Sequence, residues 1–353
     1  MLTRLHIQNY RGIRDLTLEP LARLTLLVGE NGAGKTSVLE AIALLGSAGR
    51  PGAVAPIAAT RGPEVRGPGA GTLEAEMLRD LVWLPMFGGL DGTSRIVVTA
   101  QDGVDATSLT IRMETVEETT ITELRREGSF VPAVEEALSL TYTRGEDVFE
   151  SRALLGADEL MHAQQRRDLP APNFVFLPPG SGLASQDAMK LGALRREKRS
   201  DFLLDALSEL DPRIRSVEEN SSSGTPAIYC DVEGLPRLMS LSSLGAGLAR
   251  VARYLIAIAS RPGSVVLIDE IENGLHHGAL FTAWKAIRSV AERFDAQVFA
   301  TTHSWECIRA AHDALGVEEI HLARIEREEG IARAVQYSDE ALGAALEFEM
   351  EMR

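Results

Sequence analysis

Several features that are common in secreted and membrane proteins are missing from this sequence. It contains only two cysteines, Cys230 and Cys307, and they do not have the spacing of a metal-ligand cluster. No apolar run approaches the roughly 18 residues that a membrane-spanning helix needs, and residues 1–6 show no apolar core of a signal peptide. We therefore expect a cytoplasmic protein without a membrane partner, in which both cysteines are buried free thiols.

The chain also has fewer positive than negative side chains. The chain has 36 Lys and Arg against 51 Asp and Glu, a net charge of −15 at pH 7, which argues against a surface that coats nucleic acid broadly. Two local basic patches, at residues 195–199 and 166–167, are better explained as solvated helix faces. The charge of the chain therefore neither indicates nor excludes a nucleic-acid partner.

The chain of 353 residues, 45% of them hydrophobic, is long enough for one large or two ordinary domains. Its apolar periodicities predict strands near residues 5–7, 16–18, 24–28, 94–100, 108–113, 138–142, 174–177, 213–217, 226–232 and 318–325, and helices near 37–45, 185–210, 244–260, 276–293, 304–314 and 338–350. Residues 47–72 are rich in Gly, Pro and Ala and are predicted to be a loop. The strands between 94 and 152 predict an antiparallel sheet beside an α/β core.

Lysine is rarer still, since only positions 35, 190, 198 and 285 carry it and the other 32 basic residues are arginine. Lys35 lies in residues 29–36, which match the pattern G-x-x-x-x-G-K-[ST] between a predicted strand and a predicted helix. In such a loop the backbone N–H groups surround phosphates, Lys35 reaches the β- and γ-phosphates of ATP, and the Thr36 hydroxyl binds Mg²⁺. The predicted nucleotide-binding residues of this loop are Asn31, Gly32, Ala33, Gly34, Lys35, Thr36 and Ser37.

A second set of polar residues follows two later apolar strands. Residues 264–268 are apolar after the first position and are followed by Asp269 and Glu270, at the strand edge where α/β sheets place their ligands. Asp269 is predicted to hold Mg²⁺, directly or through water, and Glu270 to orient and polarise the attacking water. His303 ends the next predicted strand, and we interpret it as a sensor of the γ-phosphate rather than a structural histidine.

A Ser- and Gly-rich segment, residues 241–248, opens a predicted apolar helix between these elements. Such a helix start is an anion-binding site by itself, and it is equally a simple helix N-cap. The order of the pieces along the chain favours the first interpretation, because a P-loop, a Ser/Gly helix start, an acidic strand end and a histidine strand end follow one another as in ABC-type ATPase heads.

The chain resembles the ABC-class ATPases of the OLD and SMC-like group, in particular bacterial AAA family ATP-binding proteins that share the OLD ATPase domain. The matching stretches are LHIQNYRG from residue 5, GENGAGKTSVLEAI from residue 29, SSLGAGL from residue 242, LIDEIENGLHHG from residue 267 and ATTHS from residue 300. The resemblance implies an α/β P-loop NTPase fold with an ABC-type head, in which a mixed or parallel core sheet is flanked by helices and joined by an antiparallel β lobe. It implies one head over residues 1–353, divided into a P-loop lobe (1–46), a β-rich insertion (47–171) and a lobe with the later motifs (172–353).

The resemblance also implies a homodimer or higher oligomer, in which each ATP is held between the P-loop of one subunit and the Ser/Gly segment of the other. Ser243 and Gly245 would then contact the γ-phosphate of the partner's ATP, residues 272–276 would couple the two sites, and Arg11 would join the nucleotide-binding residues. Two departures are visible. The sequence SSLGAG differs from LSGGQ, which leaves Ser242 and Ser243 as alternatives, and only Gln186 is available as a Q-loop residue.

Relatives of the OLD type carry a nuclease domain after the ATPase, whereas about 50 residues follow His303 here. We therefore expect an ATPase without nuclease activity, and the resemblance implies that it regulates a separate effector, a nuclease or a toxin, in defence against phage. The alternative is a DNA repair or recombination clamp of the RecF and SMC type, and a transporter subunit is disfavoured. The acidic residues at 347, 349 and 351 are interpreted as a solvated helix end, and the role of residues 73–171 stays open.

Overall fold

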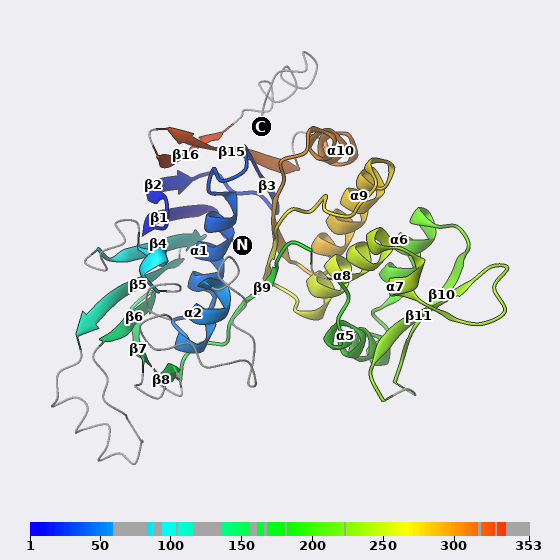
Figure 1. Cartoon of the computed structure of the whole chain (residues 1–353), viewed down its shortest axis with the longest axis horizontal. Helices are drawn as coiled ribbons and strands as arrows, with labels where there is room; N and C mark the ends of the chain where they lie inside the picture. Colours follow the sequence, from blue (N-terminus) through cyan, green and yellow to red (C-terminus); the bar gives the residue numbers. More distant parts are fainter. Residues whose placement is uncertain are drawn as a thin grey trace.

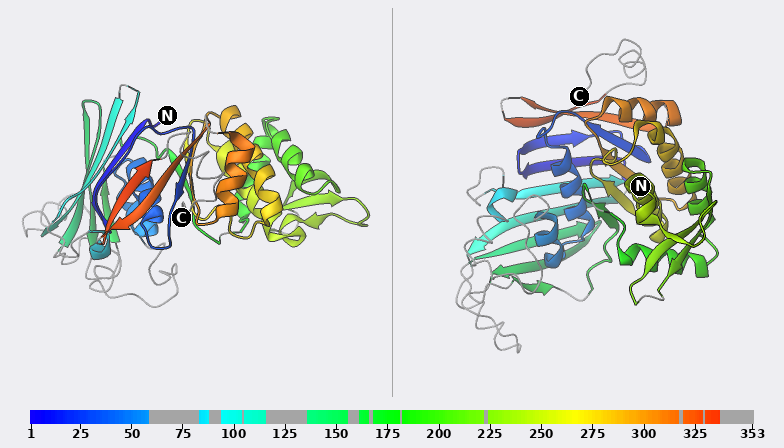
Figure 2. Two further views of the ribbon diagram at one scale, coloured as in Figure 1. Left: turned by 90° about the horizontal axis from the view of Figure 1, so that it is seen from above. Right: turned by 45° about the vertical axis from the view of Figure 1, so that its right-hand side comes forward.

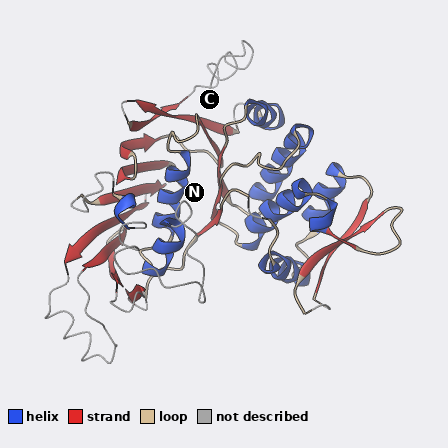
Figure 3. Ribbon diagram, viewed as in Figure 1, coloured by secondary structure: helices blue, strands red, loops and turns tan. Residues whose placement is uncertain are grey.

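The computed structural model describes residues 1–58, 83–87, 94–103, 105–115, 136–155, 161–165, 168–180, 182–221, 224–316, 319–328 and 330–336. These residues form three sheets and two groups of helices (Figures 1 and 3). The larger two sheets face each other across one pair of helices, and the remaining helices cover the outer side of the second sheet (Figure 2).

A seven-stranded sheet forms one outer layer of the molecule. Its order is β2-β1-β4-β5-β6-β7-β8, and every neighbouring pair is antiparallel. The strands are β1 (Arg4–Tyr10), β2 (Ile13–Leu18), β4 (Ile96–Asp102), β5 (Asp105–Thr115), β6 (Glu136–Arg144), β7 (Asp147–Leu155) and β8 (Met161–Gln165). The antiparallel sheet that the sequence predicts between residues 94 and 152 is confirmed, and β1 and β2 extend it. The division of the chain into three lobes stays a prediction.

A six-stranded sheet forms the centre. Its order is β16-β15-β3-β14-β13-β9, with every strand parallel to its neighbours except the edge strand β16. The strands are β3 (Leu24–Val28), β9 (Phe174–Leu177), β13 (Val265–Ile268), β14 (Gln297–Thr301), β15 (Ile320–Glu328) and β16 (Ile331–Gln336). Every residue of β3 and of β14 is buried, which is expected for parallel strands covered on both faces.

Helices cover both faces of this central sheet. The helices α1 (Lys35–Gly46) and α2 (Pro51–Ala58) lie between it and the seven-stranded sheet (Figures 1 and 2). The other face carries α5 (Ser185–Arg196), α6 (Asp201–Leu210), α7 (Leu241–Leu244), α8 (Ala246–Ser260), α9 (His277–Arg293) and α10 (Trp305–Leu315), next to a small sheet of β10 (Ile214–Asn220), β11 (Ala227–Val232) and β12 (Met239–Ser240). A short 3₁₀ helix, η3, spans Leu84–Met86. None of the helices in the described ranges is long and apolar enough to cross a membrane.

The core is divided by the central sheet into two clusters. Leu24, Leu26 and Val28 of β3 pack with the α8–α10 side, whereas Leu27 packs with the α1 side. This alternation follows from the two-residue period of a strand, which sends successive side chains to opposite faces. Both cysteines are free and buried, as expected, and burial raises the pKa of Cys230 to about 11 and that of Cys307 to about 12.

Two expectations about local structure need correction, and a third is not tested. Residues 51–58 form the helix α2 rather than a loop, and residues 59–72 lie outside the described ranges. The single helix expected over 185–210 is two helices, α5 and α6, separated by a turn in which Lys198 has a φ of 57°. The helix expected at 338–350 lies outside the described residues, and so does the acidic group near the end of the chain.

Candidate nucleotide-binding site

The loop between β3 and α1 adopts backbone conformations that favour glycine. Gly29, Gly32 and Gly34 have φ values of 138°, 80° and 120°, a region that residues with a side chain avoid. At Gly29 the space is also closed, because a Cβ there would lie 2.2 Å from the backbone oxygen of Ile325 on β15. The loop is therefore fixed both by its own conformation and by its contact with the neighbouring strand.

Helix α1 begins directly at the end of this loop. It has no side-chain N-cap bond and no acidic residue in its first turn, so its first amide groups keep their capacity to bind an anion. The side chain of Lys35 is only 7% exposed, and its Nζ donates to the backbone oxygens of Gly29 at 2.6 Å and Glu30 at 2.9 Å. The ammonium is thus held inside the loop, next to the positions where phosphate oxygens would lie.

The hydroxyl of Thr36 meets the carboxylate of Asp269, although 233 residues separate them in the chain. Thr36 Oγ1 donates to Asp269 Oδ1 at 3.1 Å, and Thr301 Oγ1 donates to the same oxygen at 2.5 Å. Asp269 is 4% exposed. A hydroxyl and a carboxylate oxygen that converge beside a phosphate loop fit Mg²⁺, which prefers oxygen ligands and commonly binds through one or two carboxylates and substrate phosphates.

Glu270 follows Asp269 at the end of β13 and has a φ of 51°, the left-handed region that non-glycine residues rarely adopt. Its backbone N–H donates to Thr301 Oγ1 at 2.8 Å, and the Asn273 side-chain amide donates to its Oε2 at 3.4 Å. Strained backbone of this kind is concentrated at functional sites, where the surrounding contacts maintain it. Thr301 therefore supports both carboxylates, since it accepts from the backbone of one and donates to the side chain of the other.

His303 comes shortly after β14, the strand that lies between β3 and β13. The carboxyl ends of these three strands are adjacent, so the structure brings the P-loop, Asp269, Glu270 and His303 to one edge of the sheet. The ring of His303 is 46% exposed and lies against Glu272. The expected grouping of these residues is observed, and their individual roles stay predictions.

Arg11 lies in the turn between β1 and β2 and points to helix α1. Its Nε lies 2.7 Å from Glu40 Oε2, in a pair where Glu40 is fully buried and Arg11 is 13% exposed. The Tyr10 hydroxyl donates to the same carboxylate at 3.2 Å, and burial together with the Glu40 charge raises the pKa of Tyr10 above its usual range. The pair joins the first strands to the P-loop helix, and the predicted contact of Arg11 with nucleotide stays a prediction.

The Ser/Gly segment is not part of this site within one chain. Ser243 and Gly245 are both exposed, at the junction of α7 and α8. Figures 1 and 2 place this junction on the far side of the central sheet from α1. Gly245 has a φ of 145°, and helix α8 starts without a side-chain cap. Within one chain these residues therefore lie apart from the P-loop, and their predicted contact with the γ-phosphate stays a prediction.

Sequence reasoning gave no role to Thr301 or to β15. Thr301 could have been found, because it lies in the quoted ATTHS stretch, whereas β15 carries no motif that would give it a role. A polar cavity of about 380 Å³ adjoins the loop and is lined by Glu30, Asn31, Gly32, Ala33, Arg324, Ile325, Glu326 and Arg327. The Arg327 guanidinium also donates to the Gly32 backbone oxygen at 3.4 Å. One wall of the space beside the P-loop thus comes from β15.

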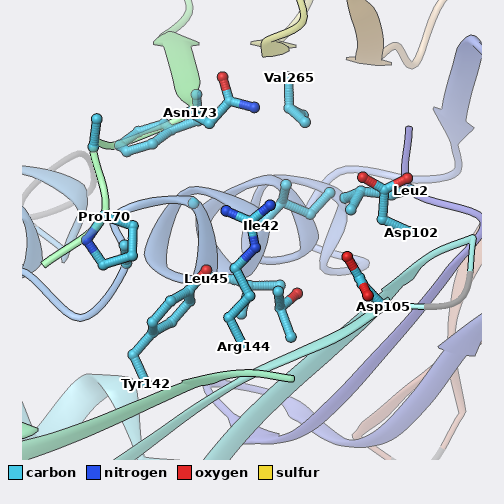
Figure 4. A pocket seen from close by; sticks show the side chains of 15 residues that line it. Leu2, Ile42, Leu45, Asp102, Asp105, Tyr142, Arg144, Pro170, Asn173 and Val265 are labelled. Atoms are coloured by element: carbon cyan, nitrogen blue, oxygen red, sulfur yellow. The ribbon is translucent and has the colours of Figure 1, made fainter. Parts of the chain in front are cut away.

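A second cavity, of about 140 Å³, lies at the other end of α1 (Figure 4). Leu45 and Gly46, the last residues of α1, line it, together with Tyr142 and Arg144 of β6. Ile42 also lines it, seven residues along α1 from Lys35, so at about 1.5 Å per residue the cavity begins roughly 10 Å from the phosphate loop. It is separate from the candidate nucleotide site.

Comparison with known proteins gives a family and several relatives. Residues 24–308 match the family described as "AAA domain, putative AbiEii toxin, Type IV TA system". An ATP/GTP phosphatase of Helicobacter pylori is 23% identical over 340 residues, which cover 87% of this chain and 86% of that protein. The DNA replication and repair protein RecF of Shewanella woodyi is 58% identical over 45 residues, but these are 13% of this chain and only 12% of RecF.

Among solved structures, the Smc head domain with an extended coiled coil, bound to the C-terminal domain of ScpA and derived from Pyrococcus furiosus, is similar in fold. Its TM-score is 0.50 at 13% sequence identity, and the match covers 99% of both chains. At this identity the similarity concerns the fold alone. It agrees with the fold class expected from the sequence, an α/β P-loop NTPase with an ABC-type head.

Proposed function

This chain belongs to the family described as "AAA domain, putative AbiEii toxin, Type IV TA system", and we propose that it is an ATPase that dimerises around ATP and regulates a separate effector protein. The observation that carries the proposal is the meeting of Thr36 and Asp269 at 3.1 Å, directly beside Glu270 and the phosphate loop. This arrangement supports binding of ATP with Mg²⁺ and its hydrolysis at one edge of the central sheet.

Each residue has a task that its position supports. The amide groups at the start of α1 and the Lys35 ammonium bind the phosphates, and Lys35 exchanges its two backbone carbonyl partners for phosphate oxygens. Thr36 and Asp269 hold Mg²⁺, which supplies charge neutralisation at the phosphates when it is bound. Glu270 orients a water for attack on the γ-phosphorus and takes its proton, and the ring of His303 contacts the γ-phosphate.

The dimer is proposed because one chain lacks part of the site. Ser243 and Gly245 are exposed on the opposite side of the central sheet from their own P-loop, in a helix start that suits an anion. A second copy placed head to head brings this segment over the ATP of the first copy, and the symmetry of the pair makes two equivalent sites. ATP then acts as the bridge between the subunits.

The type of effector and its biological setting are a more specific part of the proposal. We assign the chain to the OLD-like group on the motifs quoted above, with a nuclease or a toxin as the separate effector and defence against phage as the setting. The family description, which names a putative toxin of a toxin–antitoxin system, supports a setting of this kind, and the separate effector is inferred from the motifs. Purified chain is expected to hydrolyse ATP and to leave DNA and RNA intact.

The test of the ATPase proposal uses Glu270→Gln and Lys35→Ala. Glu270→Gln keeps ATP binding and lowers the rate of phosphate release by about 100-fold or more, because glutamine has nearly the shape of glutamate but cannot accept the proton of the water. Lys35→Ala weakens ATP binding by roughly tenfold or more, since a hydrogen bond to a charged group contributes about 1.5–3 kcal/mol. Glu292→Gln, an exposed carboxylate on α9, is the matched control with parental activity. Parental turnover in Glu270→Gln contradicts the assignment of the base.

A second candidate is a clamp on DNA of the RecF and SMC type. The similarity to RecF favours it, although it covers 13% of this chain. Binding of DNA that requires ATP and weakens steeply with salt supports this candidate, since phosphate contacts release counterions. Unchanged binding with and without ATP contradicts it.

A further inference from the structure

The carboxylate of Glu272 lies against His303 through two contacts on one oxygen. The backbone N–H of His303 donates to Glu272 Oε1 at 3.0 Å, and the ring Nδ1 of His303 lies 3.2 Å from the same oxygen. The Glu272 side chain is 12% exposed and the His303 ring is 46% exposed. The carboxylate is therefore the buried partner, and the ring of His303 is the exposed one.

The contact determines which ring nitrogen carries hydrogen. A carboxylate oxygen only accepts hydrogen bonds, so Nδ1 must be the donor of the pair. The Nε2 atom then has no partner among the described residues and is the ring atom left for a ligand. The other carboxylate oxygen of Glu272 is buried and has no hydrogen-bond partner within the described part of the chain. The polar contacts of this carboxylate in that part of the chain are therefore those with His303.

The backbone around Glu272 is held by helix α8. The Tyr254 hydroxyl donates to the Ile271 backbone oxygen at 3.4 Å, and the Arg250 guanidinium donates to the Asn273 backbone oxygen at 2.5 Å. Both donors lie on α8, the helix whose N-cap is Gly245. The position of Glu272, and through it the direction of the His303 ring, thus depends on the helix that carries the Ser/Gly segment of the same chain.

We propose that Glu272 is a positioning residue for ATP hydrolysis, which fixes His303 in the tautomer with hydrogen on Nδ1 and turns Nε2 toward the γ-phosphate. This inference rests on the proposed function, because His303 is placed at the γ-phosphate there. It goes beyond that function by giving Glu272 a role inside its own subunit. Removal of the carboxylate leaves the ring free to rotate and to adopt the other tautomer, in which hydrogen lies on Nε2.

The test compares Glu272→Ala with Glu272→Gln. Glu272→Ala lowers kcat about tenfold, within the range typical of residues that orient a functional histidine, and changes the KM for ATP less than twofold. Glu272→Gln keeps an acceptor oxygen for the His303 N–H groups and retains at least about half of the parental kcat. Glu292→Ala is the control for loss of a carboxylate elsewhere and keeps parental kcat and KM.

The second readout is nitrogen NMR of the protein labelled with ¹⁵N-histidine, at pH 8.5, where an ordinary histidine ring is neutral. The signal that disappears in His303→Gln identifies His303. It shows the Nδ1–H tautomer in the parental chain and in Glu272→Gln, and the Nε2–H tautomer in Glu272→Ala. An Nε2–H ring in the parental chain, an unchanged tautomer in Glu272→Ala, or an equal loss of kcat in both variants overturns the proposal. Because the NMR result requires no ATP hydrolysis, a chain without ATPase activity contradicts the proposed function and leaves this readout intact.

Discussion

Replacement of Gly29 by alanine tests how the phosphate loop is fixed in place. Two penalties act at this position. Its φ of 138° disfavours any residue with a Cβ, by about 1–2 kcal/mol. The new Cβ would also lie 2.2 Å from the Ile325 backbone oxygen, and relief of such overpacking costs about 1–3 kcal/mol because main chain must move. The free energy of unfolding therefore falls by about 2–5 kcal/mol.

Gly32→Ala is the matched control, because it changes the same loop without the collision. Gly32 has a φ of 80°, and nothing lies within 4 Å of a Cβ at this position. Its expected loss is only the conformational strain of about 1–2 kcal/mol. Urea unfolding, followed by circular dichroism, gives both free energies from the midpoint and slope. A Gly29→Ala chain that is as stable as Gly32→Ala refutes the reasoning, since it would show that β15 does not restrict the loop.

Three further predictions concern the dimer, the buried ion pair and the thiols. Ser243→Arg keeps ATP binding, measured by calorimetry, and abolishes turnover because the larger side chain obstructs the partner's site; parental turnover contradicts the sandwich. Glu40→Ala leaves Arg11 without its buried carboxylate and lowers the free energy of unfolding by about 3 kcal/mol in urea, whereas a loss below about 1 kcal/mol shows that the pair contributes little. Burial raises the pKa of Cys307 from 9.0 to about 12, so the folded chain keeps this proton when the unfolded chain loses it, and stability falls as pH rises above about 9. Cys307→Ala therefore loses less stability than the parent between pH 8 and pH 10, and equal losses contradict the assignment.

The sequence predicts best where one local pattern determines the structure. Residues 24–28 are five consecutive apolar or β-forming residues before a glycine, and the strand β3 has these same limits. The P-loop and helix α1 follow for the same reason, because the glycine spacing and the apolar helix pattern agree. The edge at which Asp269 and His303 meet is also predictable, since the carboxyl ends of parallel strands lie together.

The sequence predicts less well where burial overrides local propensity. Pro51 and the small residues after it are typical of a loop, yet α2 begins at Pro51, where the missing N–H of proline costs nothing. Val54 and Ile57 are buried at 0% and 4% exposure, and their packing stabilises the helix. The apolar contacts that decide this segment come from other parts of the chain, and a local pattern does not contain them.

Supporting residues of the site are the hardest to predict. Thr301 bonds to Asp269 across 32 residues, and Glu272 contacts His303 across 31 residues, so neither pairing follows from spacing in the chain. Both depend on the neighbouring positions of β13 and β14 in the sheet. Arg11 pairs with Glu40 across 29 residues, another contact that spacing in the chain does not reveal, and its contact with nucleotide stays a prediction.

The most direct test of the central claim is the mass of Glu270→Gln in solution, measured by light scattering with and without ATP and Mg²⁺. The account predicts a monomer of 38.2 kDa without nucleotide and twice that mass with ATP and Mg²⁺, because hydrolysis no longer separates the two copies. Ser243→Arg in the same background serves as the control and stays monomeric. A mass that does not change with ATP, whether that of a monomer or of an assembly already formed, contradicts dimerisation around ATP.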